Sequence, residues 1–174
     1  MVAKRWRRLG ALLLFCTSCA GAAIAAQDTP SFSASLMDFE LAALDGSQFV
    51  RLSSHAKLAG HPVLINFWSS ECPPCIREMP LLDAQARLPS QIAFIGIAVD
   101  DRQHALQLVR RQALSYLQLA APSQPAALLT RFGDRLHGLP YTVMLDASHR
   151  ICAAHLGEVD AAWLTNAIAT CGQP

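Results

Sequence analysis

The chain has 174 residues, of which 52% are hydrophobic and 16% are charged. This is long enough for one domain with a full hydrophobic core and short for two. The formal net charge is +1, but four of the 14 basic residues lie in the first eight positions, so the chain after residue 26 is mildly acidic. An acidic body without a basic stripe argues against nucleic acid as a partner.

Residues 1–26 have the layout of a secretory signal. A basic head is followed by an uncharged run from Leu9 to Ala26 that ends in small residues. An uncleaved N-terminal membrane anchor is the alternative, because 18 uncharged residues are at the lower limit for spanning a bilayer. Lipid attachment at Cys19 is a weaker alternative. We therefore expect the protein to act outside the cytoplasm.

The remaining chain alternates between apolar runs typical of strands and amphipathic stretches typical of helices. Residues 27–35 are small and polar and predict a linker, and the Asp45-Gly46 turn predicts an N-terminal β-hairpin. The expected strands are residues 39–44, 48–52, 62–68, 92–99, 116–120, 141–145 and 151–155. The expected helices are residues 72–88, 102–112, 124–132 and 161–170. This order predicts one α/β domain over residues 36–174, with a mixed central sheet and helices on both faces.

Cys72 and Cys75 form a C-x-x-C pattern where a predicted buried strand meets a predicted helix. The N-terminus of a helix stabilises a thiolate, and this spacing allows a disulfide within one turn. A purely structural disulfide would close too short a loop to add much stability, and a zinc site would need a second ligand pair. The pattern predicts a redox pair, with Cys72 as the exposed nucleophile and Cys75 as the buried resolving thiol.

The dipeptide between the cysteines bears on the direction of the reaction. Pro73 and Pro74 offer the sulfurs neither positive charge nor N–H donors, so nothing in the dipeptide favours a thiolate. This predicts a reductase of protein disulfides rather than an oxidase. An oxidase or isomerase stays as the alternative, and the reduction potential would separate the two.

Two further cysteines and one histidine leave alternatives open. Cys152 lies on the last predicted strand and Cys171 near the end of the last helix, so they form a second disulfide or stay as buried free thiols. His137 is either an ordinary loop residue or, if it converges with Cys72 and Cys75, a third copper ligand in a metallochaperone. Apart from that alternative, no metal or organic cofactor is expected.

The segment VLINFWSSECPPCIREMP, residues 63–80, resembles the active-site segment of the thioredoxin-like superfamily. It is most similar to the periplasmic TlpA/ResA branch, which includes the reductases of cytochrome c maturation. The resemblance extends over nearly all of the chain after the expected signal and includes the turn at Asp45 and the segment GLPYTVMLD from Gly138. It implies a thioredoxin-like fold and a periplasmic thiol:disulfide oxidoreductase, soluble or tethered to the inner membrane.

The resemblance also implies roles for particular residues. The family proline that matches Pro140 is cis, so Pro140 and Leu139 would border the Cys72 sulfur and present backbone to an extended substrate. Glu78 matches an active-site glutamate that would relay protons, whereas from the residues alone an ordinary solvated helix glutamate is an equal alternative. Trp68 would close the active-site strand and be partly exposed beside the disulfide.

Glu71 departs from the family, which usually has a tryptophan or a similar residue before the first cysteine. A carboxylate there reduces the flat apolar docking surface and opposes thiolate formation at Cys72. The expected substrate groove is lined by Trp68, Glu71, Pro73, Pro74 and Leu139.

The partners that the resemblance implies are proteins. The substrates would carry disulfides, as apocytochrome c and copper-site proteins do, and a membrane thiol electron donor of the DsbD type would restore the reduced pair. We expect a monomer.

Overall fold

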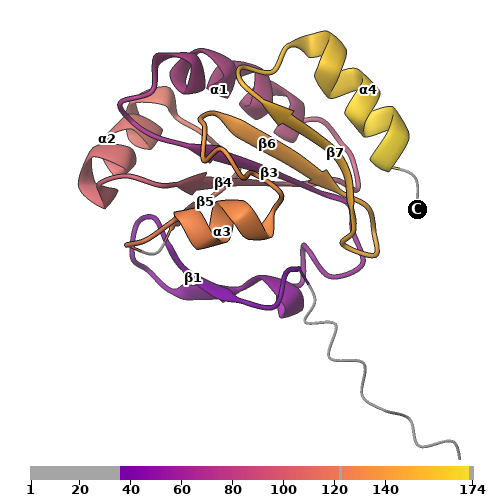
Figure 1. Cartoon of the computed structure of the whole chain (residues 1–174), viewed down its shortest axis with the longest axis horizontal. Helices are drawn as coiled ribbons and strands as arrows, with labels where there is room; N and C mark the ends of the chain where they lie inside the picture. Colours follow the sequence, from indigo (N-terminus) through magenta and orange to yellow (C-terminus); the bar gives the residue numbers. More distant parts are fainter. Residues whose placement is uncertain (1–35, 122, 173–174) are drawn as a thin grey trace, which may run out of the picture. The chain divides into compact units, whose positions relative to one another are not determined.

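The computed structural model describes residues 36–172, with the exception of residue 122 (Figure 1). The expected signal or anchor over residues 1–26 and the linker over residues 27–35 lie outside the described residues, so both stay predictions. In the described part of the chain, none of the helices combines the length and the apolar composition needed to cross a bilayer.

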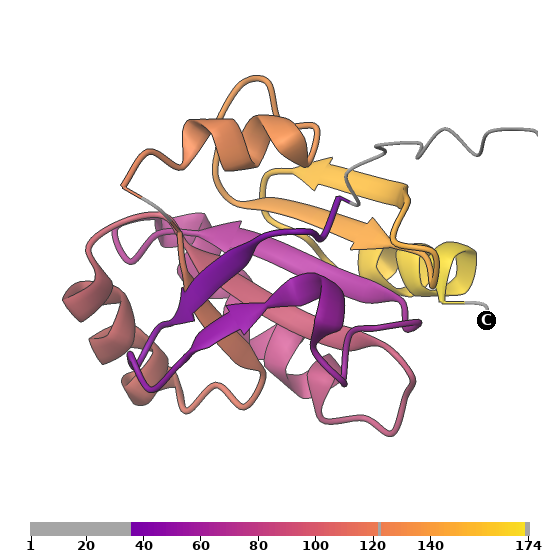
Figure 2. The ribbon, with the colours of Figure 1, turned by 90° about the horizontal axis from the view of Figure 1, so that it is seen from below.

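The described residues form a mixed sheet of seven strands in the order β2-β1-β5-β4-β3-β6-β7 (Figures 1 and 2). The central strands β3, β4 and β5 are parallel, whereas the remaining neighbours pair antiparallel. The strands are β1 (Glu40–Ala43), β2 (Phe49–Arg51), β3 (Val63–Trp68), β4 (Ala93–Ala98), β5 (Leu117–Ala120), β6 (Tyr141–Leu145) and β7 (Ile151–Leu156).

Helices cover both faces of this sheet. They are α1 (Pro73–Ala86), α2 (Arg102–Gln112), α3 (Ala126–Arg131) and α4 (Ala161–Cys171), and a short 3-10 helix, η1, spans Leu52–Ser54. Every residue of β3 is buried, because this central strand packs against helices on either side. Ile65 and Phe67 belong to the core with α3, whereas Leu64 and Trp68 pack with α1, α2 and α4. The predicted α/β fold, with its mixed sheet and its N-terminal hairpin of β1 and β2, is confirmed.

Candidate active site

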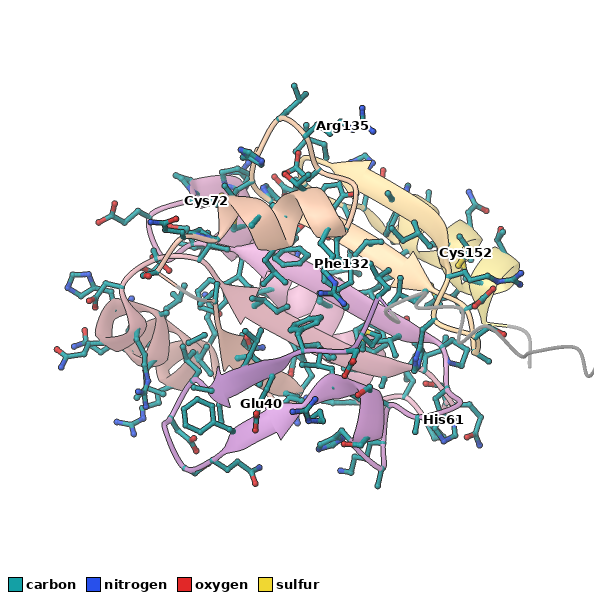
Figure 3. The ribbon with its side chains drawn as sticks, turned by 60° about the horizontal axis from the view of Figure 1, so that its bottom comes forward. Glu40, His61, Cys72, Phe132, Arg135 and Cys152 are labelled. Carbon is teal, nitrogen blue, oxygen red and sulfur yellow. A yellow bond between two sulfur atoms is a disulfide. The ribbon has the colours of Figure 1, made fainter. Side chains whose placement is uncertain are left out.

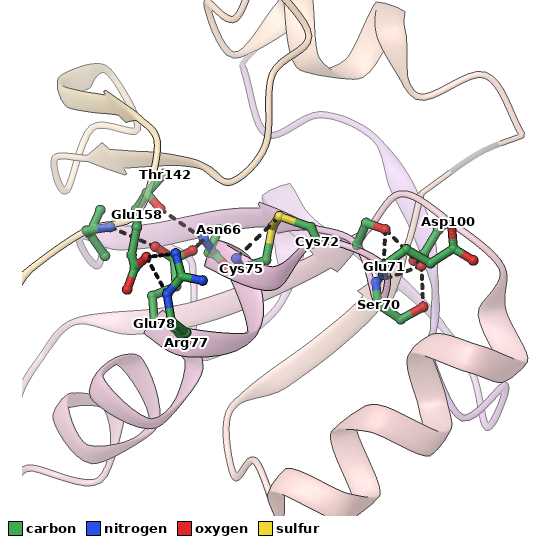
Figure 4. The surroundings of a disulfide bond; sticks show 12 residues. Asn66, Ser70, Glu71, Cys72, Cys75, Arg77, Glu78, Asp100, Thr142 and Glu158 are labelled. Atoms are coloured by element: carbon green, nitrogen blue, oxygen red, sulfur yellow. Dashed lines mark hydrogen bonds and ion pairs between the residues drawn. A yellow bond between two sulfur atoms is a disulfide. The ribbon is translucent and has the colours of Figure 1, made fainter.

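The two cysteines of the C-x-x-C pattern lie at the junction of β3 and α1 and form a disulfide (Figure 4). The Cα atoms of Cys72 and Cys75 are 5.3 Å apart. Cys72 is the N-cap residue of α1, and its sulfur accepts a hydrogen bond from the Cys75 N–H at 3.3 Å. Cys75 is fully buried and Cys72 is partly exposed. A partner can therefore reach the Cys72 sulfur more readily than the Cys75 sulfur.

The first turn of α1 has fewer donors than the first turn of an ordinary helix. Pro73 and Pro74 occupy its first two positions and have no N–H group, so the Cys75 N–H is the donor directed at the Cys72 sulfur. A thiolate at Cys72 is stabilised chiefly by hydrogen bonds and by the positive end of the helix. The two prolines therefore weaken one of these two sources of stabilisation.

The loop between β3 and α1 is held by Asp100, which follows β4. Its Oδ2 atom accepts hydrogen bonds from the Ser69 hydroxyl at 3.0 Å, from the Ser70 N–H at 2.7 Å and from the Ser70 hydroxyl. Because β3 and β4 are parallel neighbours, their carboxyl ends meet at the same edge of the sheet. Sequence reasoning missed this role of Asp100, although polar residues after two consecutive predicted strands were a signal for it.

Pro140, directly before β6, has the cis peptide bond that the family resemblance implies. The Leu139–Pro140 peptide bond is cis, and Pro140 is buried. Leu139 and Cys72 both pack against the apolar cluster that contains Cys75. The Pro140 carbonyl accepts a hydrogen bond at 2.8 Å from the Gly157 N–H, just after β7. The structure therefore confirms the cis-proline and brings the residue before it, Leu139, next to the cysteine pair.

Glu78 is a buried carboxyl, one helical turn beyond Cys75. Its side chain is 1% exposed, so the alternative of an ordinary solvated helix glutamate is wrong. Asn66 Nδ2 donates to Glu78 Oε1 at 2.7 Å and to Thr142 Oγ1 at 2.9 Å, and the Val159 N–H donates to Glu78 Oε2 at 2.8 Å (Figure 4). Two segments far from α1 in the sequence thus donate to one carboxyl group, and Thr142 holds the Asn66 amide in place.

Burial raises the pKa of Glu78 from its ordinary value of 4.5 to about 7. The hydrogen bonds from Val159 and Asn66 favour the charged form and oppose this shift, while the nearby Glu158 carboxylate adds to it. A carboxyl with a pKa near neutrality can both accept and release a proton at the pH at which thiols exchange.

Glu78 is expected to make the stability of the fold depend on pH. Because its pKa is raised in the folded protein, the native state binds this proton more tightly than the unfolded state. Its contribution to stability is therefore full below pH 4.5 and is lost as the pH rises to about 7. Glu78→Gln should reduce the difference in unfolding free energy between pH 5 and pH 8 by roughly 2 kcal/mol, measured by urea denaturation.

Glu71→Gln, at an exposed carboxyl, is the matched control and should keep the difference in unfolding free energy between pH 5 and pH 8. An unchanged difference in the Glu78 variant would contradict the assignment.

Trp68 does not line an exposed groove, contrary to expectation. Its side chain is fully buried and packs in the cluster with Cys75 and Met79. The indole N–H donates to Gln118 Oε1 at 3.1 Å, which satisfies its one polar group inside the core. Trp68 is buried because α1 and α2 cover this face of the sheet. Its side chain therefore packs behind Cys75 of the disulfide instead of lining the groove.

The other expected groove residues lie around the disulfide at or near the surface. Glu71 and Pro73 are exposed, whereas Pro74 and Leu139 are partly buried. Glu71 also borders a polar hollow of about 220 Å³, together with Ser70, His104, Gln107 and Arg111. The surface on this side of Cys72 is therefore charged rather than apolar.

The structure does not assemble the copper site of the alternative hypothesis. The His137 ring is hydrogen bonded through Nε2 to the Thr130 hydroxyl at 2.8 Å. Among residues 36–172, residue 122 aside, no group of three or more histidine, cysteine or acidic side chains is arranged to hold a metal ion. His137 therefore does not join Cys72 and Cys75.

Cys152 on β7 and Cys171 at the end of α4 are joined by a second disulfide, with Cα atoms 5.8 Å apart. Cys152 is exposed and Cys171 is buried. Figure 3 shows the Cys152 and Cys72 side chains at opposite sides of the domain, so the two disulfides are separate. The second one ties the last helix to the edge strand of the sheet.

A redox-spaced disulfide at a strand–helix junction, together with a cis-proline directly before β6, defines a thioredoxin-like thiol:disulfide oxidoreductase. The family model named Redoxin matches residues 25–168. The thioredoxin-like protein YneN of Bacillus subtilis (strain 168) is 31% identical over 123 residues, which are 70% of this chain and 69% of that protein. The chain belongs to the Redoxin family.

Solved structures share the fold. A secreted disulfide oxidoreductase of Mycobacterium tuberculosis, homologous to Escherichia coli DsbE, is similar with a TM-score of 0.64 at 22% identity, over 77% of this chain and 96% of that one. A thiol:disulfide interchange protein of the thioredoxin family from Chlorobium tepidum gives a TM-score of 0.66 at 22% identity, over 78% and 93% of the two chains. At these identities the likeness supports the fold alone.

Proposed function

We propose that this oxidoreductase works as a reductase of protein disulfides, of the periplasmic TlpA/ResA type. The observation that carries the proposal is the first turn of α1, where two prolines leave the Cys72 sulfur with one directed N–H donor. Strong oxidants owe their potential to a stabilised thiolate in the reduced form. A pair whose thiolate is less stabilised holds its electrons less tightly and passes them to a substrate.

The proposed reaction is a pair of thiol–disulfide exchanges. The Cys72 thiolate attacks a substrate disulfide, a mixed disulfide forms, and the released substrate thiolate takes up a proton. Cys75 then loses its proton and attacks the Cys72 sulfur, which releases the second substrate thiolate and leaves the disulfide that the structure contains. Two electrons have passed from the dithiol of the protein to the substrate.

Glu78 is the group proposed to accept the proton of Cys75. Both side chains lie on the buried face of α1, one turn apart, where bulk water does not reach them directly. A carboxylate with a pKa near 7 can take this proton and later return it when the pair is reduced again. Pro140 and Leu139 are proposed to hold the substrate backbone beside Cys72.

The compartment and the partners belong to the same proposal. Residues 1–26 have the pattern of an export signal or anchor, and the similar protein of M. tuberculosis is a secreted one. We place the protein in the periplasm as a monomer, soluble or tethered to the inner membrane. A membrane thiol donor of the DsbD type would supply two electrons and two protons per cycle, and apocytochrome c or a copper-site protein would be the substrate.

The reduction potential of the Cys72–Cys75 pair tests the direction of the reaction. We expect a value near or below about −220 mV in glutathione or dithiothreitol redox buffers, with each cysteine followed by alkylation and mass mapping. Mass mapping keeps this pair apart from Cys152 and Cys171. A value near about −120 mV, typical of strong oxidants, would overturn the assignment as a reductase.

A further inference from the structure

The short segment 157–159, between β7 and α4, contacts both the cis-proline Pro140 and the buried carboxyl of Glu78. The Gly157 N–H donates to the Pro140 carbonyl at 2.8 Å, and the Val159 N–H donates to Glu78 Oε2 at 2.8 Å. Gly157 has a φ of 109°, a backbone conformation that favours glycine. One stretch of three residues therefore connects the cis-proline loop with the buried carboxyl.

An ion pair fastens this segment to α1. Arg77 donates to Glu158 Oε2 from Nε at 2.9 Å and from Nη2 at 2.6 Å (Figure 4). Arg77 directly precedes Glu78 on the helix, and Glu158 directly precedes Val159 in the segment. The pair thus links the two backbones at the point where the Val159 N–H meets the Glu78 carboxyl.

The exposure of the ion pair argues against a role in stability alone. The Arg77 side chain is 60% exposed and the Glu158 side chain is 38% exposed. A pair this accessible is screened by water and salt and adds little to the stability of a fold. Its charges nevertheless lie next to a buried carboxyl, where the dielectric is lower and their effect is larger.

We propose that Arg77 and Glu158 are positioning residues for Glu78. Their ion pair holds segment 157–159 against α1, and the balance of their two charges sets how readily the Glu78 carboxyl exchanges its proton. Any effect on catalysis rests on the function proposed above for Glu78.

The other groups around Glu78 are uncharged, so the ion pair carries the charge on this side of the site. Asn66 from β3 and Thr142 from β6 form the hydrogen-bonded network, and Tyr116, just before β5, is close enough for the Glu78 charge to act on it. Cys75 is in a disulfide. Of the described residues, Glu158 is the carboxylate whose charge raises the pKa of Glu78, in addition to the effect of burial.

Two single variants separate the effect of the charges on Glu78 from the effect of the tether. Both variants break the ion pair, but each leaves a charge of opposite sign beside Glu78. In the full-length oxidised protein, the titration midpoint of Glu78 is measured from the ¹³C NMR shift of its side-chain carboxyl, assigned with Glu78→Gln. Glu158→Gln removes a negative charge and should lower the midpoint by roughly half a pH unit. Arg77→Gln leaves Glu158 uncompensated and should raise it. Both shifts should shrink in high salt.

A charge exchange and a control complete the test. The double variant Arg77→Glu/Glu158→Arg can keep the tether but puts a positive charge on the segment, the side of the ion pair whose charge acts on Glu78, so its midpoint should fall below that of the parent protein. Arg150→Gln breaks a comparable exposed pair with Asp146 and should leave the midpoint unchanged. If the two single variants shift the midpoint in the same direction, or not at all, the proposal is wrong. Because the oxidised protein is titrated without turnover, this result is independent of whether the protein proves to be a reductase.

Discussion

Replacement of Cys75 by serine is expected to stop the reaction at a mixed disulfide between Cys72 and its substrate. Cys72 is the partly exposed sulfur and would still attack, whereas the buried residue 75 would no longer provide a thiol to resolve the product. Turnover should fall below detection while a covalent complex accumulates. Non-reducing electrophoresis and mass mapping of a reduced Cys75→Ser protein with an oxidised model substrate would show it.

The reciprocal variant is the matched control. Cys72→Ser should lose turnover to the same extent but should trap no complex, because Cys75 is fully buried. Trapping through residue 75 in that variant, with none in Cys75→Ser, would reverse the roles assigned to the two cysteines. Both variants keep the second disulfide, so a difference between them reports on the active pair alone.

Loss of the Cys152–Cys171 disulfide is expected to cost about 3 kcal/mol of unfolding free energy by the chain-entropy relation. The bond closes a loop between residues 19 apart in sequence and ties α4 to the exposed edge strand β7. Urea denaturation of the oxidised Cys152→Ser/Cys171→Ser protein against the parent chain measures the loss.

Removal of the other disulfide provides the comparison. Cys72 and Cys75 are separated by three positions, so Cys72→Ser/Cys75→Ser should cost clearly less stability, because the loop it opens is much shorter. The Cys152→Ser/Cys171→Ser protein should also keep the reduction potential of the active pair. A loss below about 1 kcal/mol for the longer loop would show that the bond does not act as a structural clip.

The burial of Glu78 follows the helical periodicity of α1. The buried residues of α1 are Cys75, Glu78, Met79 and Leu82, which follow the helical spacing of three and four residues. From the residue type alone, a solvated glutamate and an active-site glutamate are equal alternatives at this position. Its spacing from Cys75 and Leu82 was a signal that placed it on the inner face of the helix.

The surroundings of Trp68 and Asp100 could not be predicted from local sequence patterns. Trp68 ends one predicted strand and Asp100 follows the next, so the sequence places both residues at the carboxyl ends of the central strands. Whether a residue at that edge is exposed depends on which helix covers it, and this is decided by packing between segments far apart in the chain. Trp68 is covered by α1 and α2, whereas the Asp100 carboxylate binds the loop that precedes Cys72.

The sequence by itself determined the order of strands and helices, the mixed sheet and the position of the cysteine pair at a strand–helix junction. These features follow from local periodicity and turn chemistry, which neighbouring residues encode. The tertiary structure alone decided that Asn66, Thr142 and Val159 surround Glu78, and that Arg77 meets Glu158 across 81 positions. Such contacts depend on how separate segments pack around one core, and no local pattern in the chain specifies them.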